Sequence, residues 1–377
     1  MRPATKTAAA VTTAIGVGAA AVVAGRFASD AALKAPPGRP LPSGRRLTVH
    51  ATEPGRVTLT RALASLRPGI YGLAGDGDEV HAVVGDVIEG ASDTADTVVR
   101  RLERVTRGVL VAGDRVRFTP QLHRGTPSAA LGIEYRDAEI ASELGPLPAW
   151  FVPAARATWV IAVHGLGTTR EHPLNVLEFL HGQQLPVLCL AYRGDEGAPR
   201  SPDGLGHLGD SEWRDLDAAI RYALRSGAQN VILYGWSTGA TMALHAAARC
   251  AQRERVSGVV LDSPVLDWEF TLRALAAARR TPGPLLPLAV RAAQGRTGLG
   301  GDRLREAVDP RALRVPTLLF HGPGDTLAPW GPSRQLAERR PDLVTLHTVA
   351  DAPHASMWNA DPSGYEEILR RFLTPLM

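Results

Sequence analysis

The sequence predicts an α/β fold, in which a small β-rich domain precedes a mostly parallel, doubly wound sheet. Two observations lead to this prediction. From about residue 145, short apolar runs alternate with amphipathic helical stretches, as in chains that form parallel sheets. Before that point, short β-like runs are separated by Gly and Asp turns. At 377 residues and 45% hydrophobic, the chain is long enough for one large domain and one smaller one.

The amino end carries an uncharged apolar run, AAAVTTAIGVGAAAVVAG (residues 8–25), with basic residues on both sides. About eighteen residues is near the lower limit for a membrane-spanning helix and long for a signal-peptide core. We therefore expect residues 1–34 to form an uncleaved signal anchor that attaches the protein to a membrane. A cleaved export signal and an Ala-rich surface or disordered helix are the alternatives. Residues 35–46, APPGRPLPSGRR, predict an extended linker.

Residues 47–144 are expected to form the small β-rich domain. Residues 69–90 hold two apolar runs around a Gly-Asp-Gly turn, which is typical of a hairpin, and residues 109–118 hold a second pair around Gly-Asp. Between them, residues 93–107 have helical character. This part of the sequence shows no catalytic constellation, so it predicts no role for the domain.

Residues 145–377 are expected to form the sheet domain. Two of its helices are clear from their periodicity. One begins at the capping residue Ser211 and ends at Gly227, and the other closes the chain over residues 364–373. The expected strands are residues 159–163, 187–191, 231–234, 259–261, 317–320 and 344–349.

Charge and cysteine content argue against two classes of site. The net charge is +4, but among the Lys and Arg residues only Lys6 and Lys34 are lysines. The arginines are scattered among acids without a basic run interleaved with aromatics, so nucleic-acid binding is not expected. Cys189 and Cys250 fall in apolar contexts. We expect them to be buried small side chains rather than a disulfide or a metal pair, and no metal site is predicted.

A single serine lies between two glycines where an expected strand becomes an expected helix, in GWSTG (residues 235–239). In a tight strand-to-helix turn, side chains two positions before and after the serine would clash, so both positions need glycine. Such a turn lifts the hydroxyl above the sheet and points helix N–H groups at the atom it attacks. Ser237 is therefore the candidate nucleophile. The pattern alone arises often by chance, so its partners have to be found at other strand ends.

Two further strand ends supply a base and an acid, and the carboxyl ends of parallel strands lie along one edge of a sheet. HGPGD (residues 321–325) puts Asp325 in a loop where it can orient a histidine. PHAS (residues 353–356) puts His354 where it can take the serine proton as general base and then protonate the leaving group. The order serine, aspartate, histidine is that of one serine-triad fold and differs from the two other known orders.

The first strand end of this series, HGLG (residues 164–167), predicts a close approach of the backbone to a substrate oxygen. The N–H of Leu166 and the N–H of Thr238, the residue after the serine, are the expected oxyanion hole.

These four motifs together resemble the α/β-hydrolase family over about residues 145–377. The resemblance implies a mostly parallel sheet of about eight strands with helices on both faces. It also implies a triad of Ser237, His354 and Asp325 without a cofactor. The segments YRGDEGAP and EWRDL further resemble the monoacylglycerol-lipase-like and prolyl-oligopeptidase-like branches. Peptidases of the second branch usually carry another glycine after the elbow, where Ala240 stands here, which disfavours a peptidase.

Two features leave alternatives open. Asp262 ends the strand expected at 259–261 and is a rival for the triad acid, although the loop pattern favours Asp325. Residues 266–311 interrupt the strand alternation with a Leu/Ala/Arg-rich stretch. Inserts at this place in the family commonly form a helical lid, whose apolar side chains could line an acyl pocket.

The sequence thus predicts a serine hydrolase that cleaves carboxylic acyl esters through an acyl-enzyme intermediate. Its expected partners are a small-molecule or lipid-like ester and, through residues 1–34, a membrane. A serine peptidase or amidase on the same triad is the alternative, and a non-catalytic membrane-anchored binding protein is the third hypothesis. The fold itself does not select among substrates.

Overall fold

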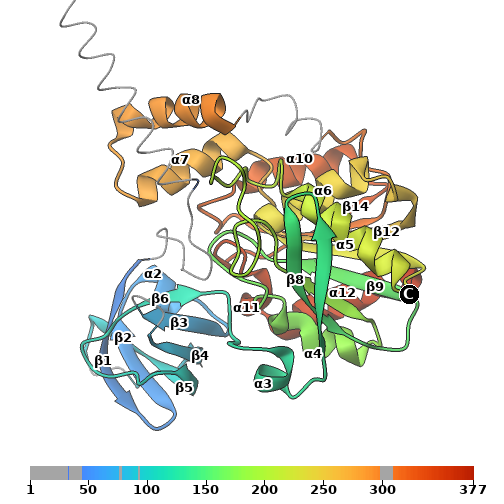
Figure 1. Cartoon of the computed structure of the whole chain (residues 1–377). Coiled ribbons are helices and arrows are strands. Elements are labelled where there is room, and N and C mark those ends of the chain that lie inside the picture. Colours follow the sequence, from blue (N-terminus) through green and yellow to red (C-terminus); the bar gives the residue numbers. More distant parts are fainter. Residues whose placement is uncertain (1–32, 34–44, 76–78, 92–93, 298–308) are drawn as a thin grey trace, which may run out of the picture.

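The computed structural model describes residue 33 and residues 45–75, 79–91, 94–297 and 309–377 (Figure 1). The expected signal anchor and most of the expected linker lie outside these residues, so both stay predictions. None of the helices in the described ranges is both long and apolar enough to span a bilayer. The described chain forms a small barrel and a larger α/β unit (Figure 1).

Six strands close into the barrel in the order β1-β2-β5-β4-β3-β6. They are β1 (Leu47–Glu53), β2 (Arg56–Thr60), β3 (Tyr71–Gly75), β4 (His81–Val87), β5 (Thr97–Arg107) and β6 (Arg115–Thr119). The short helix α2 (Leu63–Leu66) lies between β2 and β3. Apolar side chains from all six strands, such as Leu59 and Leu73, point inward and fill the barrel, as expected for a barrel of this size.

The sequence expectations for this region have different outcomes. The hairpin expected at 69–90 is confirmed, because β3 and β4 pair antiparallel. Of the pair expected at 109–118, only the second run forms a strand, β6. The helical character expected at 93–107 is wrong, because β5 pairs with both β2 and β4. Its β-branched start pairs with β2 and buries Val98 and Val99, which outweighs the helix-like spacing of the charges that follow.

The larger unit is built on an eight-stranded sheet with the order β14-β13-β12-β11-β9-β10-β8-β7. Its strands are β7 (Arg136–Ser142), β8 (Gly145–Val152), β9 (Thr158–Val163), β10 (Val187–Leu190), β11 (Asn230–Trp236), β12 (Val256–Asp262), β13 (Thr317–His321) and β14 (Val344–Thr348). Strands β9 to β14 pair in parallel, which confirms the six strands expected from the sequence.

The boundary expected at residues 144 and 145 needs a correction. Strand β7 pairs antiparallel with β8, and β8 pairs antiparallel with β10, so residues 136–142 already belong to the larger sheet. An antiparallel edge hairpin has the same sequence pattern as the β-rich region before it. The domain boundary therefore leaves no mark in the sequence at this point.

Helices cover both faces of the sheet. α4 (Leu174–Gly182) and α12 (Pro362–Leu373) pack on one face, and α5 (Trp213–Arg225), α6 (Thr238–Arg249) and α10 (Trp330–Arg339) pack on the other. Contrary to expectation, Ser211 does not cap α5; Glu212 is its N-cap and makes no side-chain capping bond. Shorter helices are α3 (Pro127–Leu131) and α11 (Met357–Ala360), and 3₁₀ turns occur at Arg253–Arg255, Gly283–Leu285 and Thr374–Leu376.

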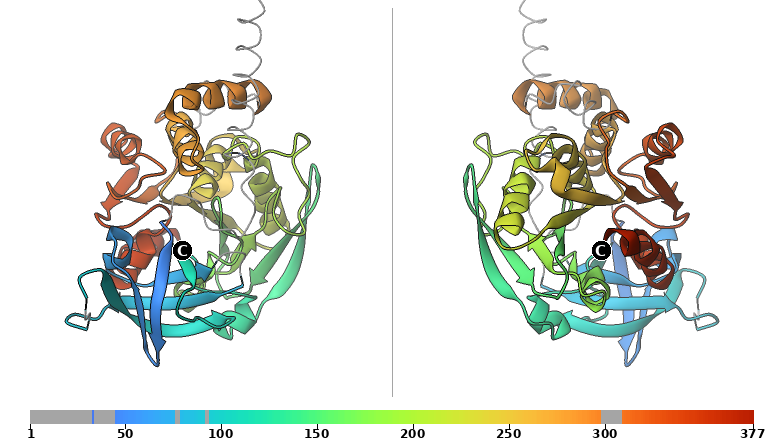
Figure 2. Two further views of the ribbon diagram at one scale, coloured as in Figure 1. Left: turned by 90° about the vertical axis from the view of Figure 1, so that its left-hand side faces the viewer. Right: turned by 90° about the vertical axis from the view of Figure 1, so that its right-hand side faces the viewer.

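The insert expected at 266–311 is helical where it is described, as α7 (Trp268–Ala278) and α8 (Leu286–Thr297). The barrel and this insert lie at opposite ends of the molecule (Figure 1, Figure 2). Trp268 packs with Leu272 and Leu275 in a small apolar cluster that Leu33 also joins.

Two asparagines of the larger unit fix the barrel to it. Nδ2 of Asn359 donates to the carbonyl oxygens of Ile70 and Pro120, at 2.9 Å each, and the Asn359 carbonyl accepts the N–H of Ile70 at 2.9 Å. Nδ2 of Asn175 also donates to Pro120, at 2.8 Å, and its Oδ1 accepts the N–H of Leu122 at 3.2 Å. Because Asn359 follows β14 in the chain, one of these anchors lies next to the carboxyl edge of the sheet.

Candidate active site

Ser237 lies in the turn between β11 and α6, with a φ of +54° in the left-handed region. The flanking glycines are required there. A Cβ on Gly235 would lie 2.3 Å from the carbonyl oxygen of Gly239, and a Cβ on Gly239 would lie 2.2 Å from the carbonyl oxygen of Val163. A non-glycine residue held at such a φ costs about 1–3 kcal/mol and is typical of functional turns. The steric explanation for GWSTG is therefore confirmed.

The loop after β14 brings His354 to this serine. Nε2 of His354 lies 2.7 Å from Oγ of Ser237, and its Nδ1 lies 2.7 Å from Oδ2 of Asp325, in the loop after β13. Three side chains predicted from three separate strand ends thus form one hydrogen-bonded chain. When the carboxylate accepts the proton on Nδ1, Nε2 is left as the nitrogen that can take the serine proton.

Four donors stabilise the charged form of Asp325. Oδ1 accepts the N–H groups of Leu327 at 2.8 Å and Ala328 at 2.9 Å, and Oδ2 accepts Nε2 of His321 at 3.1 Å as well as His354. Burial alone would raise the pKa of this carboxyl group. The charge on His354 and the hydrogen bonds from both histidines hold the pKa well below its usual range. The carboxylate is therefore ionised throughout the neutral range.

Asp262, the rival acid, makes no hydrogen bond to His354; its partners are Ser263 and Tyr365. It is fully buried at the end of β12, where its Oδ1 accepts the hydroxyl of Ser263 at 2.8 Å. Burial raises the pKa of Asp262 to about 7. The Ser263 hydroxyl also accepts the N–H of Ala355 at 2.9 Å, so Asp262 and Ser263 hold the loop that carries His354. The arrangement favours Asp325 as the acid and gives Asp262 a positioning role.

The two N–H groups expected to form the oxyanion hole flank Ser237. Thr238 is the first residue of α6, and Leu166 lies in the turn after β9. Neither N–H donates to another group within the described ranges. Gly165 allows the β9 turn to come this close, because a Cβ there would lie 2.5 Å from Cβ of Ser237. Both donors are thus available to a substrate oxygen.

Two cavities flank this centre and share the turn Leu166, Gly167 and Thr168. The larger, of about 530 Å³, is lined by Thr238 and Met242 of α6 and by the loop between β10 and α5. The smaller, of about 350 Å³, is lined by the His354 loop on one side and by the barrel on the other. Among the described residues, neither cavity is lined by α7 or α8, and the acyl-pocket expectation for the insert stays a prediction.

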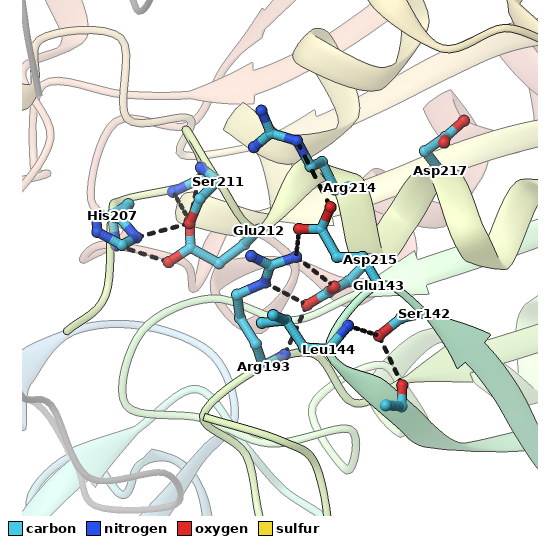
Figure 3. Close-up of polar contacts among 12 residues, drawn as sticks. Ser142, Glu143, Leu144, Arg193, His207, Ser211, Glu212, Arg214, Asp215 and Asp217 are labelled. Atoms are coloured by element: carbon cyan, nitrogen blue, oxygen red, sulfur yellow. Dashed lines mark hydrogen bonds and ion pairs between the residues drawn. The ribbon is translucent and has the colours of Figure 1, made fainter. Parts of the chain in front are cut away.

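Buried charges hold the loop that lines the larger cavity (Figure 3). Arg193 donates to both carboxylate oxygens of the fully buried Asp215, at 2.7 and 2.9 Å, and to Glu143 at 2.9 Å. Farther along the loop, Glu212 accepts the N–H of His207 at 2.6 Å. Such fully paired groups give the cavity a fixed wall.

Several contributing residues were missed by the sequence analysis. His321, whose Nδ1 lies 2.7 Å from the Ser333 hydroxyl, is a second histidine on Asp325. Its spacing of four residues from the aspartate, across a strand-end turn, was the available signal. For Ser263, the only available signal was its place between Asp262 and Pro264, directly after the end of β12. Nothing in the sequence indicated that the barrel reaches the site.

Comparisons with known proteins follow the two-part structure. Residues 160–373 match the model of the Alpha/beta hydrolase family, and residues 48–119 match that of a domain of unknown function, DUF8805. The sheet order, the strand-to-helix serine and this match define an α/β-hydrolase. The chain belongs to the α/β-hydrolase family.

Individual relatives are distant. The uncharacterized protein YfhR of Escherichia coli (strain K12) is 24% identical over 214 residues, which cover 55% of this chain and 69% of that protein. The Pyrococcus furiosus esterase Pf2001 has a similar structure, with a TM-score of 0.54 and 22% identity over 67% of this chain and 94% of that one. The DcsB structure, solved with a substrate analogue, has a TM-score of 0.51 and 17% identity over 64% and 99% of the two chains. These structural likenesses show a shared fold.

Proposed function

We propose that this hydrolase is a serine esterase that cleaves carboxylic acyl esters through a covalent acyl-enzyme. The observation that carries the proposal is the hydrogen-bonded chain from Ser237 through His354 to Asp325, with 2.7 Å at each link. It lies beside two backbone N–H groups that have no acceptor within the described part of the chain. A nucleophile, a base with its acid, and an oxyanion hole are the parts that acyl transfer requires.

In acylation, Oγ of Ser237 attacks the ester carbonyl carbon while its proton moves to Nε2 of His354. The carbonyl π electrons move onto the carbonyl oxygen, where the N–H groups of Leu166 and Thr238 each stabilise the charge by about 3–4 kcal/mol. The bond from carbon to the alcohol oxygen then breaks, and Nε2 gives its proton to that oxygen. Asp325 stabilises the imidazolium between these two transfers.

In deacylation, a water molecule takes the place of the alcohol. Nε2 of His354 accepts one water proton as the hydroxide oxygen bonds to the acyl carbon. When the bond to Ser237 breaks, the same proton passes to Oγ, and the carboxylic acid leaves. The enzyme returns to its starting protonation state, so each cycle consumes one ester and one water and releases one alcohol and one carboxylic acid.

An activity-based label tests the proposal. A fluorophosphonate reacts with a serine only where a base and an oxyanion hole activate it, so we expect the wild type to be labelled and Ser237→Ala to stay unlabelled. With a panel of acyl esters, Ser237→Ala should lower kcat by about 10⁴–10⁶-fold. Ser257→Ala, at the far end of β12, is the matched control and should stay within about twofold of the wild type.

Two outcomes contradict the proposal. If folded Ser237→Ala retains turnover, Ser237 is not the nucleophile. Esters and amides of one acyl group should also be compared, because a higher kcat/KM on the amide would replace the esterase by the amidase or peptidase that the same triad permits.

A further inference from the structure

The smaller cavity is lined by residues of both domains. From the larger unit it is lined by Leu166, Thr168 and the His354 loop. From the barrel it is lined by residues 62–64, Arg67 and Tyr71, together with residues 118–120. The barrel therefore forms one whole wall of a space that opens onto the proposed general base.

Three polar side chains on the barrel side of the cavity, Arg45, Arg67 and Tyr71, can donate hydrogen bonds to a ligand. Arg67 and Arg45 line the cavity, and no hydrogen bond or ion pair of either guanidinium occurs within the described ranges. The hydroxyl of Tyr71 is buried, in a side chain that is 1% exposed, and has no hydrogen-bond partner there. Among the described lining residues there is no carboxylate. A buried hydroxyl without a partner costs about 1–3 kcal/mol, which a ligand acceptor would recover.

A buried arginine holds this wall in place. Arg100 is fully buried and donates to the carbonyl oxygens of Ser65, Arg67, Gly69 and Gly85, at 2.6 to 3.1 Å. Three of these four carbonyls belong to the segment that carries Arg67. The Arg100 guanidinium also lies 5.8 Å from the Tyr71 ring centroid. It thus fixes the backbone at Arg67 and adds a further positive charge beneath the cavity wall.

The proposed mechanism decides which half of a substrate faces this wall. His354 must reach the leaving oxygen to protonate it, so the alcohol half of the ester lies on the His354 side. The cavity on that side is the smaller one, and the larger cavity, lined by Thr238 and Met242, takes the acyl half.

We propose that the barrel is the substrate-recognition domain of the enzyme, and that it selects esters whose alcohol half carries an anionic group, a carboxylate or a phosphate. The anion pairs with Arg67, with Arg45 at the rim, and accepts the Tyr71 hydroxyl. Burial raises the pKa of Tyr71 to about 12, so this hydroxyl stays a donor at neutral pH. The inference rests on the proposed esterase function.

Matched aryl esters test the inference. Butyrate esters of 3-hydroxybenzoate and 3-hydroxybenzamide differ in one charge and little in shape, and a 3-(phosphonomethyl)phenyl ester replaces the carboxylate by a phosphonate. We expect kcat/KM to be about tenfold higher or more for a charged ester than for the amide-bearing one, and the difference to shrink as salt is raised. The comparison of carboxylate with phosphonate distinguishes the two anions.

Variants locate the effect on the barrel. Arg67→Gln should abolish the preference for the charged ester, so that kcat/KM becomes equal for the charged and the neutral ester within about twofold. Arg104→Gln, an exposed arginine of β5 that does not line the cavity, is the matched control and should keep the preference. Tyr71→Phe removes only the hydroxyl, and it should lower kcat/KM on the charged ester by about three- to tenfold.

The failure of the inference and that of the proposed function are distinguishable. If the wild type hydrolyses the charged and neutral esters equally well, the inference is wrong while the esterase proposal stands. If neither ester is turned over, the inference is tested by how strongly each phenol protects Ser237 from fluorophosphonate labelling. Stronger protection by 3-hydroxybenzoate than by 3-hydroxybenzamide, lost in Arg67→Gln, supports the inference, and equal protection overturns it. Failure of Ser237 to be labelled at all rejects the proposed function, and the inference with it.

Discussion

Replacing Asn359 by alanine should weaken both the domain interface and catalysis. The side chain donates to the carbonyl oxygens of Ile70 and Pro120, at 2.9 Å each. Alanine leaves the Ile70 carbonyl without this donor, whereas Pro120 keeps its bond from Asn175. A stranded buried acceptor costs about 1–3 kcal/mol, so with the second lost bond we expect a loss of about 2–4 kcal/mol. With an unfolding entropy of about 2.1 cal/mol/K per residue over the roughly 320 described residues, Tm should fall by about 3–6 °C.

The same change should also lower kcat, because Asn359 follows His354 by only five residues. A displacement of about 1 Å in a catalytic group can cost about 10²-fold, so we expect kcat on a neutral ester to fall by about 10- to 100-fold. Asn175→Ala is the matched control, since it also removes two hydrogen bonds from the interface but is carried by α4, away from the His354 loop. Both variants should lose stability in a thermal melt. If Asn359→Ala loses no more kcat than Asn175→Ala, the barrel does not position the histidine.

Three further predictions concern the catalytic edge of the sheet. Gly165→Ala should lower kcat by about 10²-fold or more, because the new Cβ would lie 2.5 Å from Cβ of Ser237. Gly182→Ala has open space around its Cβ and should leave kcat within about twofold. Equal effects of the two variants on kcat would refute the steric explanation. Asp325→Asn should lower kcat by about 10⁴-fold and Asp262→Asn by less than about tenfold, and the reverse order would make Asp262 the acid. Asp262 has a pKa of about 7 in the folded chain against 3.8 as its ordinary value, so the wild type should lose stability as pH rises from 4 to 7. The Asp262→Asn variant cannot lose stability in this way. In urea unfolding, the free energy of unfolding of the variant minus that of the wild type should therefore increase by about 4 kcal/mol between pH 4 and pH 8. If this difference stays constant with pH, the pKa of Asp262 is not raised.

The triad could be predicted because its signals are local. Two glycines around Ser237 are imposed by backbone contacts within a few residues and with the neighbouring strand. Asp325 and His354 each follow a buried strand, and parallel strands bring their carboxyl ends to one edge whatever the details of packing. Strand and helix alternation fixed the order of these elements, so the residues that meet in space were readable from the chain.

The rest depended on contacts between distant segments. Strand β5 has a helix-like charge spacing, and only pairing with β2 and β4 makes it a strand. Strand β7 joins the larger sheet through an antiparallel hairpin that resembles the region before it. Tyr71 and Arg67 have no catalytic signature of their own. They line the site only because the barrel is docked beside His354. Hydrogen bonds from two asparagines, Asn175 and Asn359, hold the barrel there, and no local sequence pattern identifies either asparagine.

The way in which the barrel is docked also determines how a substrate enters. Five hydrogen bonds join Asn175 and Asn359 to Ile70, Pro120 and Leu122. At a net 0.5–1.5 kcal/mol each, swinging the barrel away would cost about 5 kcal/mol before any apolar contact is counted. At about 1.4 kcal/mol per factor of ten, only about one molecule in several thousand would be open at a given moment. The barrel wall is therefore preformed during turnover, and an ester enters the site without displacement of the barrel.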